Sequence, residues 1–103
     1  MTTENDPASV EQCPAEGLLK MLSGKWKPQI FRLAVEGPLR FNGLLRRLPG
    51  ASRQSLAAAL REMEESGLLS KTLVRQKPLH IEYTLSARGK SLLAVFQTLE
   101  NLL

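Results

Sequence analysis

The chain has 103 residues, of which 43% are hydrophobic and 23% are charged, with a formal net charge of +4 and a single cysteine. This length suits one compact domain, and no apolar run approaches the roughly 20 residues that a membrane-spanning helix needs. The polar, acidic start does not have the form of a secretory signal, and a lone cysteine excludes an internal disulfide. The composition therefore predicts one cytoplasmic domain that does not enter a membrane.

The first part of the chain divides into an acidic tail and two helical stretches. Residues 1–12 carry acidic side chains without apolar periodicity, which predicts a disordered tail ahead of one domain over residues 13–103. Pro14 suits the first turn of a helix that Gly24 ends. A second helix is expected over residues 26–36, because its apolar side chains recur with helical spacing.

The next segment predicts a short strand and a brief helix. Leu39 to Phe41 suits a strand, and Asn42 is a residue type that caps helices. The helix after Asn42 would bring leucines to the core before Pro49 and Gly50 force a turn.

A central amphipathic helix is expected to begin at Ser52 and to end at Gly67. At about 100° per residue, Leu56, Leu60 and Met63 share one side with Ala59 beside them, which predicts the buried face. The acidic far end would be repelled by DNA, so the first half of this helix must be the part that enters a groove. The side chains that point away from the core are Gln54, Ala58 and Arg61, with Ala57 on the flank.

Two short strands and a last helix complete the chain. The stretches 69–75 and 80–85 have the length and composition of strands, and the basic turn 76–79 joins them. Ser86 is expected to cap the last helix, whose apolar stripe continues to the final residue. The order helix, stop, strand, turn, strand predicts a mainly α fold with a small antiparallel β wing, which is a winged helix-turn-helix.

Basic side chains gather on the predicted helix-turn-helix and wing. Five arginines and no carboxylate lie between Gly37 and Arg61, and the stretch from Lys71 to Ile81 is also basic without a carboxylate. This distribution favours contacts with DNA phosphates over an ordinary solvated face. The expected recognition-helix contacts are Ser52, Arg53, Gln54, Ser55, Ala57, Ala58 and Arg61. The expected contacts from the backbone-binding segments and the wing are Arg40, Arg46, Arg47, Arg75, Lys77 and His80.

Six segments resemble the HxlR family of bacterial winged-helix transcriptional regulators, which are relatives of the MarR group. The segments are Cys13-Pro14-Ala15-Glu16 followed by Gly24-Lys25-Trp26, then residues 37–42, 48–52, 60–68 and 82–85. The resemblance covers about residues 13–101, and the order and spacing of the segments together make it specific. The resemblance implies a homodimer that binds a pseudo-palindromic operator in double-stranded DNA, with residues 52–61 in the major groove and residues 75–80 as the wing.

One departure from the family pattern leaves the reading of bases open. Ala57, Ala58 and Ala59 stand where such proteins often carry polar or basic residues. Hydrogen bonds to bases would then come largely from Gln54, Arg53, Ser55 and Arg61, and the alanines could contact thymine methyl groups. The alternative is a winged helix that binds a protein or a small ligand, with the alanine face as the contact surface.

Dimer contacts, a redox response and enzymatic activity complete the expectations. The terminal apolar stripe needs a cover, which predicts a homodimer through the N- and C-terminal helices. The resemblance suggests that Cys13 senses oxidants or electrophiles, and an equal alternative is that Cys13 is a compact filler. His80 lacks partners at metal-ligand spacing, and no phosphate loop or nucleophile-base pair appears. We therefore expect no metal, no cofactor and no enzyme.

Overall fold

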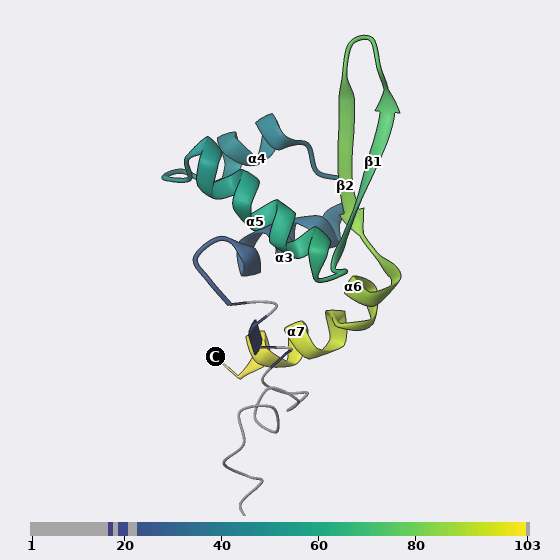
Figure 1. The fold of residues 1–103 in the computed structure, drawn as a ribbon. Helices are drawn as coiled ribbons and strands as arrows, with labels where there is room; N and C mark the ends of the chain where they lie inside the picture. Colours follow the sequence, from purple (N-terminus) through teal and green to yellow (C-terminus); the bar gives the residue numbers. More distant parts are fainter. Residues whose placement is uncertain (1–16, 18, 21–22, 103) are drawn as a thin grey trace, which may run out of the picture.

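The computed structural model describes residues 17, 19–20 and 23–102 (Figure 1). Its elements in chain order are α3 (Lys27–Glu36), α4 (Phe41–Arg47), α5 (Arg53–Glu65), β1 (Leu69–Arg75), β2 (His80–Leu85), α6 (Ala87–Ser91) and α7 (Leu93–Asn101). The described chain is mainly helical with one antiparallel pair of strands, which confirms the predicted fold class. In Figure 1 the hairpin and α4 rise at one end of the molecule, and α7 lies at the other end.

The core forms where α3, α4 and α5 meet the base of the hairpin. Burying these apolar side chains stabilises the packing of short helices, which would be marginal alone. The predicted inward side of the central helix is confirmed, because its four expected core residues are all buried. The buried side chains are Ile30, Phe31, Ala34, Leu39, Leu44, Leu48, Leu56, Ala59, Leu60, Met63, Leu68, Leu69 and Leu92.

Gly67 ends α5 and turns the chain into the hairpin. Its φ of +83° lies in the left-handed region, which glycine adopts without the steric penalty of a Cβ atom. The Leu68 N–H donates to the Met63 carbonyl at 2.8 Å, and the Gly67 N–H donates to the Glu64 carbonyl at 3.0 Å. This pair of hydrogen bonds is a Schellman motif, and it fixes where the helix stops and the first strand starts.

The hairpin has the predicted strand boundaries. Its register pairs Leu69 with Leu85 at the base and Arg75 with His80 at the tip, with an irregularity before Arg75. We call β1, β2 and the turn 76–79 the wing. A single bridge joins Leu39 to Tyr83 by two hydrogen bonds of 2.8 Å, so the segment before α4 is tied to β2.

Two expectations about the segment before α4 are wrong. Leu39 makes only an isolated bridge and Phe41 already belongs to α4, because the helix begins one residue before Asn42. Arg40 is the N-cap, and no side chain caps this helix. Asn42 therefore lies within the first turn and is exposed.

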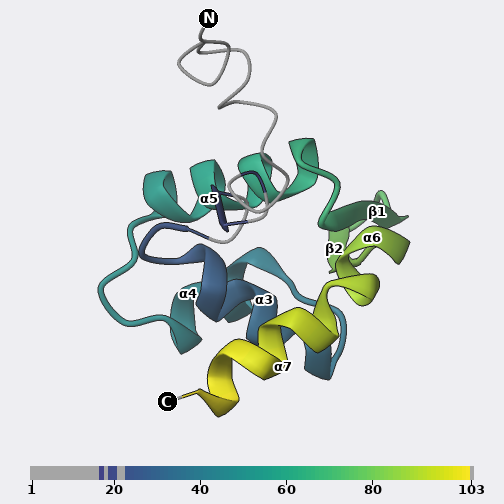
Figure 2. The ribbon, with the colours of Figure 1, turned by 90° about the horizontal axis from the view of Figure 1, so that it is seen from below.

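The last helix is divided, which the sequence did not predict. Ser86 caps α6 as expected, since its hydroxyl accepts a hydrogen bond from the Gly89 N–H at 3.0 Å. The chain then breaks at Leu92, which is buried, and α7 crosses α3 (Figure 2). The rings of Phe31 and Phe96 pack with centroids 4.8 Å apart. The N-terminal tail and most of the first predicted helix lie outside the described residues.

Candidate nucleic-acid interface

The first turn of α5 is held by a capping box between two serines. The Ser52 hydroxyl accepts from the Ser55 N–H at 3.0 Å, and the Ser55 hydroxyl accepts from the Ser52 N–H at the same distance. These bonds satisfy donors that the start of a helix leaves free. Both hydroxyls therefore serve the helix start, and the neighbouring side chains are left to face outward.

The outward face of α5 is close to the predicted one. The side chains of Arg53, Gln54, Ala57 and Arg61 are exposed, and Ala58 is half-buried. Arg53 and Arg61 form no ion pair with any residue that the structure describes. The first half of the helix thus presents a cation, an amide and a methyl group to solvent.

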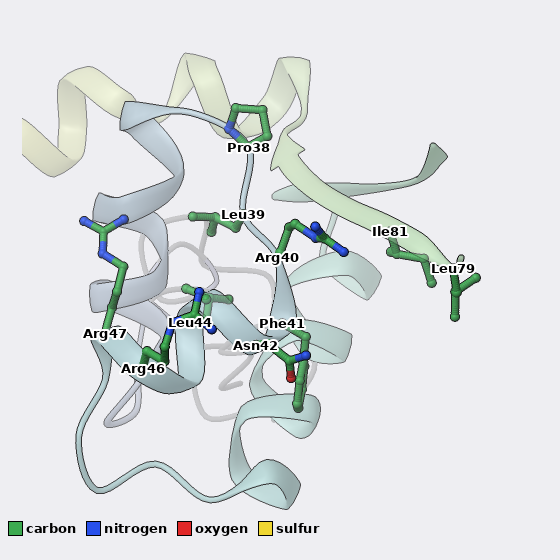
Figure 3. Close-up of a pocket in the computed structure, with 11 residues that line it drawn as sticks. Pro38, Leu39, Arg40, Phe41, Asn42, Leu44, Arg46, Arg47, Leu79 and Ile81 are labelled. Carbon is green, nitrogen blue, oxygen red and sulfur yellow. The ribbon is translucent and has the colours of Figure 1, made fainter. Parts of the chain in front are cut away.

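A cleft separates α4 from the start of β2 (Figure 3). It encloses about 650 Å³, and no carboxylate is among the residues that line it. We call it the arginine cleft, since three of the predicted phosphate contacts line it together. Its lining is Pro38, Leu39, Arg40, Phe41, Asn42, Gly43, Leu44, Arg46, Arg47, Leu79 and Ile81.

The three arginines of the cleft differ in their ion pairing. Arg47 lies 3.4 Å from a Glu36 oxygen, and both side chains are more than half exposed, so this contact is weak. Arg40 and Arg46 form no ion pair within the described part of the chain. Uncompensated guanidinium groups at a concave surface attract a polyanion, because the positive potential is concentrated there.

Leu79 and Ile81 of the wing line the cleft, and sequence reasoning missed both. Leu79 is the last residue of the turn and Ile81 is the second residue of β2, so they lie two positions apart, and this spacing was the signal that could have placed them on one face. Leu79 is 64% exposed, whereas Ile81 is half-buried. The wing therefore adds an apolar wall to a cleft whose opposite wall is cationic.

The basic wing residues do not share one environment. Arg75 and Lys77 are exposed, and neither forms an ion pair with a described residue. His80 differs, because its Nε2 lies 3.0 Å from a Glu82 oxygen and its side chain is only 19% exposed. A nearby carboxylate makes His80 the weakest of the predicted phosphate contacts.

The acidic end of α5 is attached to α3. The Lys27 ammonium lies 2.8 Å from the Glu62 carboxylate. This hydrogen bond, and then the charge of Lys27, lower the pKa of Glu62 below its ordinary value of 4.5. The pair reduces the negative charge at the end of α5 that is farther from Arg53.

A second, apolar groove lies at the other end of the molecule, between the start of α3 and α7. It encloses about 350 Å³, and we call it the terminal groove. Val95 and Leu99 are each 43% exposed, and Leu102 beyond them is 77% exposed. Arg32 pairs with Glu100 and joins α3 to α7 beside it. The lining is Leu19, Ser23, Pro28, Leu92, Val95, Phe96 and Leu99.

Three further predictions concern Cys13, metals and membranes. Cys13 lies outside the described residues. Among the residues that the structure does describe, no three His, Cys, Asp or Glu side chains gather as a metal site would require. No helix in that part of the chain is both long and apolar enough to cross a bilayer.

The three-helix core, the capped outward helix and the basic wing define a winged helix-turn-helix regulator. The model of the HxlR-like helix-turn-helix family matches residues 21–103, and the chain belongs to this family. It is a transcriptional regulator of the helix-turn-helix type, and the predicted family is confirmed.

Comparison with individual proteins agrees with the family. The chain is 39% identical to the HTH-type transcriptional regulator YdzF of Bacillus subtilis strain 168 over 83 residues, which cover 80% of this chain and 76% of YdzF. The reduced form of the redox regulator HypR superposes with a TM-score of 0.81 at 31% identity, covering 85% of this chain and 87% of HypR. The reduced form of YodB from B. subtilis superposes with a TM-score of 0.79 at 30% identity, covering 87% of this chain and 89% of YodB.

Proposed function

We propose that the protein is a non-enzymatic, cytoplasmic transcription factor that binds double-stranded DNA as a homodimer at a pseudo-palindromic operator. The observation that carries this proposal is the arginine cleft, which has no carboxylate in its lining and lies beside the exposed start of α5. Basic groups arranged in this way neutralise backbone phosphates, while the outward helix face enters the major groove.

The residues of the interface divide into two roles. Gln54 is the exposed amide near the helix start, and we assign to it direct hydrogen bonding to a base edge, with Ala57 close to thymine methyl groups. Ser52 and Ser55 position α5 through the capping box. Phosphate contacts come from Arg40, Arg46, Arg47, Arg53 and Arg61, and from Arg75 and Lys77 on the wing.

The terminal groove is the proposed dimer surface. Exposed apolar side chains on α7 surround an apolar depression, and a second copy would cover both across a two-fold axis. Two recognition helices related by this axis would read two half-sites. Sedimentation of the purified protein tests this part, and a monomer at micromolar concentration would contradict it.

Cys13 is proposed as an oxidant-responsive group. The support is similarity to HypR, which is described as a redox regulator, and to YodB, for which a diamide-treated structure exists. The test compares DNA affinity of the wild type and Cys13→Ser before and after a mild oxidant. An identical response of both proteins removes Cys13 from the mechanism and leaves it as a structural residue.

Salt dependence distinguishes DNA binding from binding of a protein or small ligand. The logarithm of the association constant for a mixed-sequence duplex should fall with log salt by about 0.9 per neutralised phosphate. Arg46→Ala should make the slope shallower by about one such unit. Lys90→Ala removes the same charge from exposed α6 and is the matched control. Failure of the wild type to bind DNA in dilute salt refutes the proposal.

A further inference from the structure

The first residues of α4 and α5 contact each other across the helix-turn-helix. The guanidinium carbon of Arg53 lies 5.7 Å from the centroid of the Phe41 ring. Phe41 is half-buried and packs against the core, whereas Arg53 is exposed. A fixed aromatic ring therefore lies beneath the head of a solvent-facing cation.

This contact is of the kind that orients an arginine. A guanidinium within about 6 Å of an aromatic centroid is attracted by the negative face of the ring, and its weak hydration makes stacking favourable. Arg53 has no carboxylate partner among the described residues, so the ring is the polarisable group that remains to hold it. The guanidinium keeps its hydrogen-bonding edge free for an anion.

The position of the ring connects two parts of the interface. Phe41 also lines the arginine cleft, at the boundary between the cleft and the start of α5. The same ring contacts Arg53, the first residue of α5, and lines the cleft together with Arg40. The Phe41 ring therefore fixes the position of the Arg53 guanidinium relative to the start of α5 and to the arginine cleft.

We propose that Phe41 is a positioning residue that holds the Arg53 guanidinium ready to bind a DNA backbone phosphate at the start of the recognition helix. This inference rests on the proposed DNA binding. An arginine ordered before binding loses less side-chain freedom on contact, so part of the contribution of Arg53 to affinity depends on the ring. Arg46 lines the same cleft, but among the described residues Arg53 is the cation that stacks on this ring, so Arg46 provides the comparison.

The contact can be tested in the free protein. In nuclear magnetic resonance spectra, the side-chain signals of Arg53 should be shifted upfield by the ring current in the wild type and in Phe41→Tyr. They should move to ordinary positions in Phe41→Leu, which keeps an apolar side chain for the core. Unchanged Arg53 signals in Phe41→Leu overturn the inference whether or not the protein binds DNA.

The consequence for binding is tested by a double-mutant cycle on a mixed-sequence duplex at low salt. Phe41→Leu should lower affinity by about two- to fivefold when Arg53 is present and have little effect in Arg53→Ala. Phe41→Tyr should retain wild-type affinity. In the matched cycle that combines Phe41→Leu with Arg46→Ala, the fold-changes in affinity of the two single variants should multiply to give that of the double variant.

The two proposals fail in different ways. If the wild type binds the duplex but the Phe41 and Arg53 effects also multiply independently, the positioning role is wrong and DNA binding stands. If no folded variant binds the duplex, the DNA-binding function is wrong, and the role of Phe41 in presenting Arg53 to a phosphate fails with it. Equal coupling of Phe41 to Arg53 and to Arg46 also overturns the inference, because it indicates a general disturbance of α4.

Discussion

Gly89 is the position where one added methyl group should damage the fold most directly. It is buried in α6, at the base of the wing. A Cβ atom there would lie 2.3 Å from the carbonyl oxygen of Leu68 and 3.1 Å from a Leu85 methyl carbon. The first contact is far inside van der Waals distance and involves backbone that cannot rotate away. The same carbonyl accepts the Ser86 N–H at 3.0 Å, so moving it also strains the start of α6.

Gly89→Ala should therefore destabilise the protein although alanine favours helices. Overpacking of this kind costs about 1–3 kcal/mol, and the gain in helix propensity is at most about 1 kcal/mol. Because the clash is with backbone, we take the upper part of that range, about 2–3 kcal/mol, and expect a net loss of about 1–2 kcal/mol, or roughly 4–15 °C in the unfolding midpoint of a domain of this size. Circular dichroism during thermal and urea unfolding measures it, at one protein concentration because self-association would shift the midpoint.

Gly43→Ala is the matched control in a second helix. Its Cβ would approach only a guanidinium nitrogen of Arg46, at 4.0 Å. Without a clash, the helix preference of alanine should raise stability by about 0.5–1 kcal/mol. Wild-type stability in Gly89→Ala, or an equal change in both variants, would refute the reasoning from close backbone approach.

Three further predictions concern an ion pair, a helix cap and the terminal groove. The Lys27–Glu62 pair has a lowered carboxylate pKa, so its small contribution is present above about pH 4.5 and is lost as pH falls through the lowered folded value. The stability difference between wild type and Glu62→Gln should accordingly vanish in acid, and a difference that grows there would contradict the pairing. Ser86→Ala should cost about 1 kcal/mol in urea unfolding, because α6 loses its cap. Leu99→Asp should weaken self-association at least about tenfold in sedimentation, since a charge would be buried, while exposed Thr98→Asp should not.

The parts of the fold that depend on neighbouring residues could be read from the sequence. The strand limits follow from local signals, with Gly67 before the first strand and Ser86 after the second. The buried side of α5 follows from helical spacing alone. These features need only positions a few residues apart, which periodicity and capping preferences describe well.

The features that the sequence did not predict depend on tertiary contacts. The helix break at Leu92 places a buried leucine between α6 and α7, and nothing near it in the sequence signals an end. The apolar wall of the arginine cleft requires β2 to be held beside the segment before α4, which the bridge between Leu39 and Tyr83 achieves. Arg32 and Glu100 are 68 positions apart, so no local pattern could pair them.

The pattern of basic residues predicted that several arginines lie together, but it did not predict how their surroundings differ. Arg40, Arg46 and Arg47 do line one cleft, as their clustering in the sequence suggested. The sequence could not show that His80 faces a carboxylate while Arg75 does not, because both lie in the same basic stretch. An ion pair with a nearby carboxylate, as between His80 and Glu82, decides which basic side chains remain able to bind an anion.

The wing extends away from the helices, and only the first of the seven residues of β1 is buried (Figure 1). Its outer half contributes little to the packed interior, so substitutions or length changes at the turn should leave thermal stability nearly unchanged. A lineage of such proteins could therefore acquire new preferences for flanking DNA by altering the tip alone. The base of the hairpin has no such freedom, because Leu69 and Leu85 join it to the body of the protein.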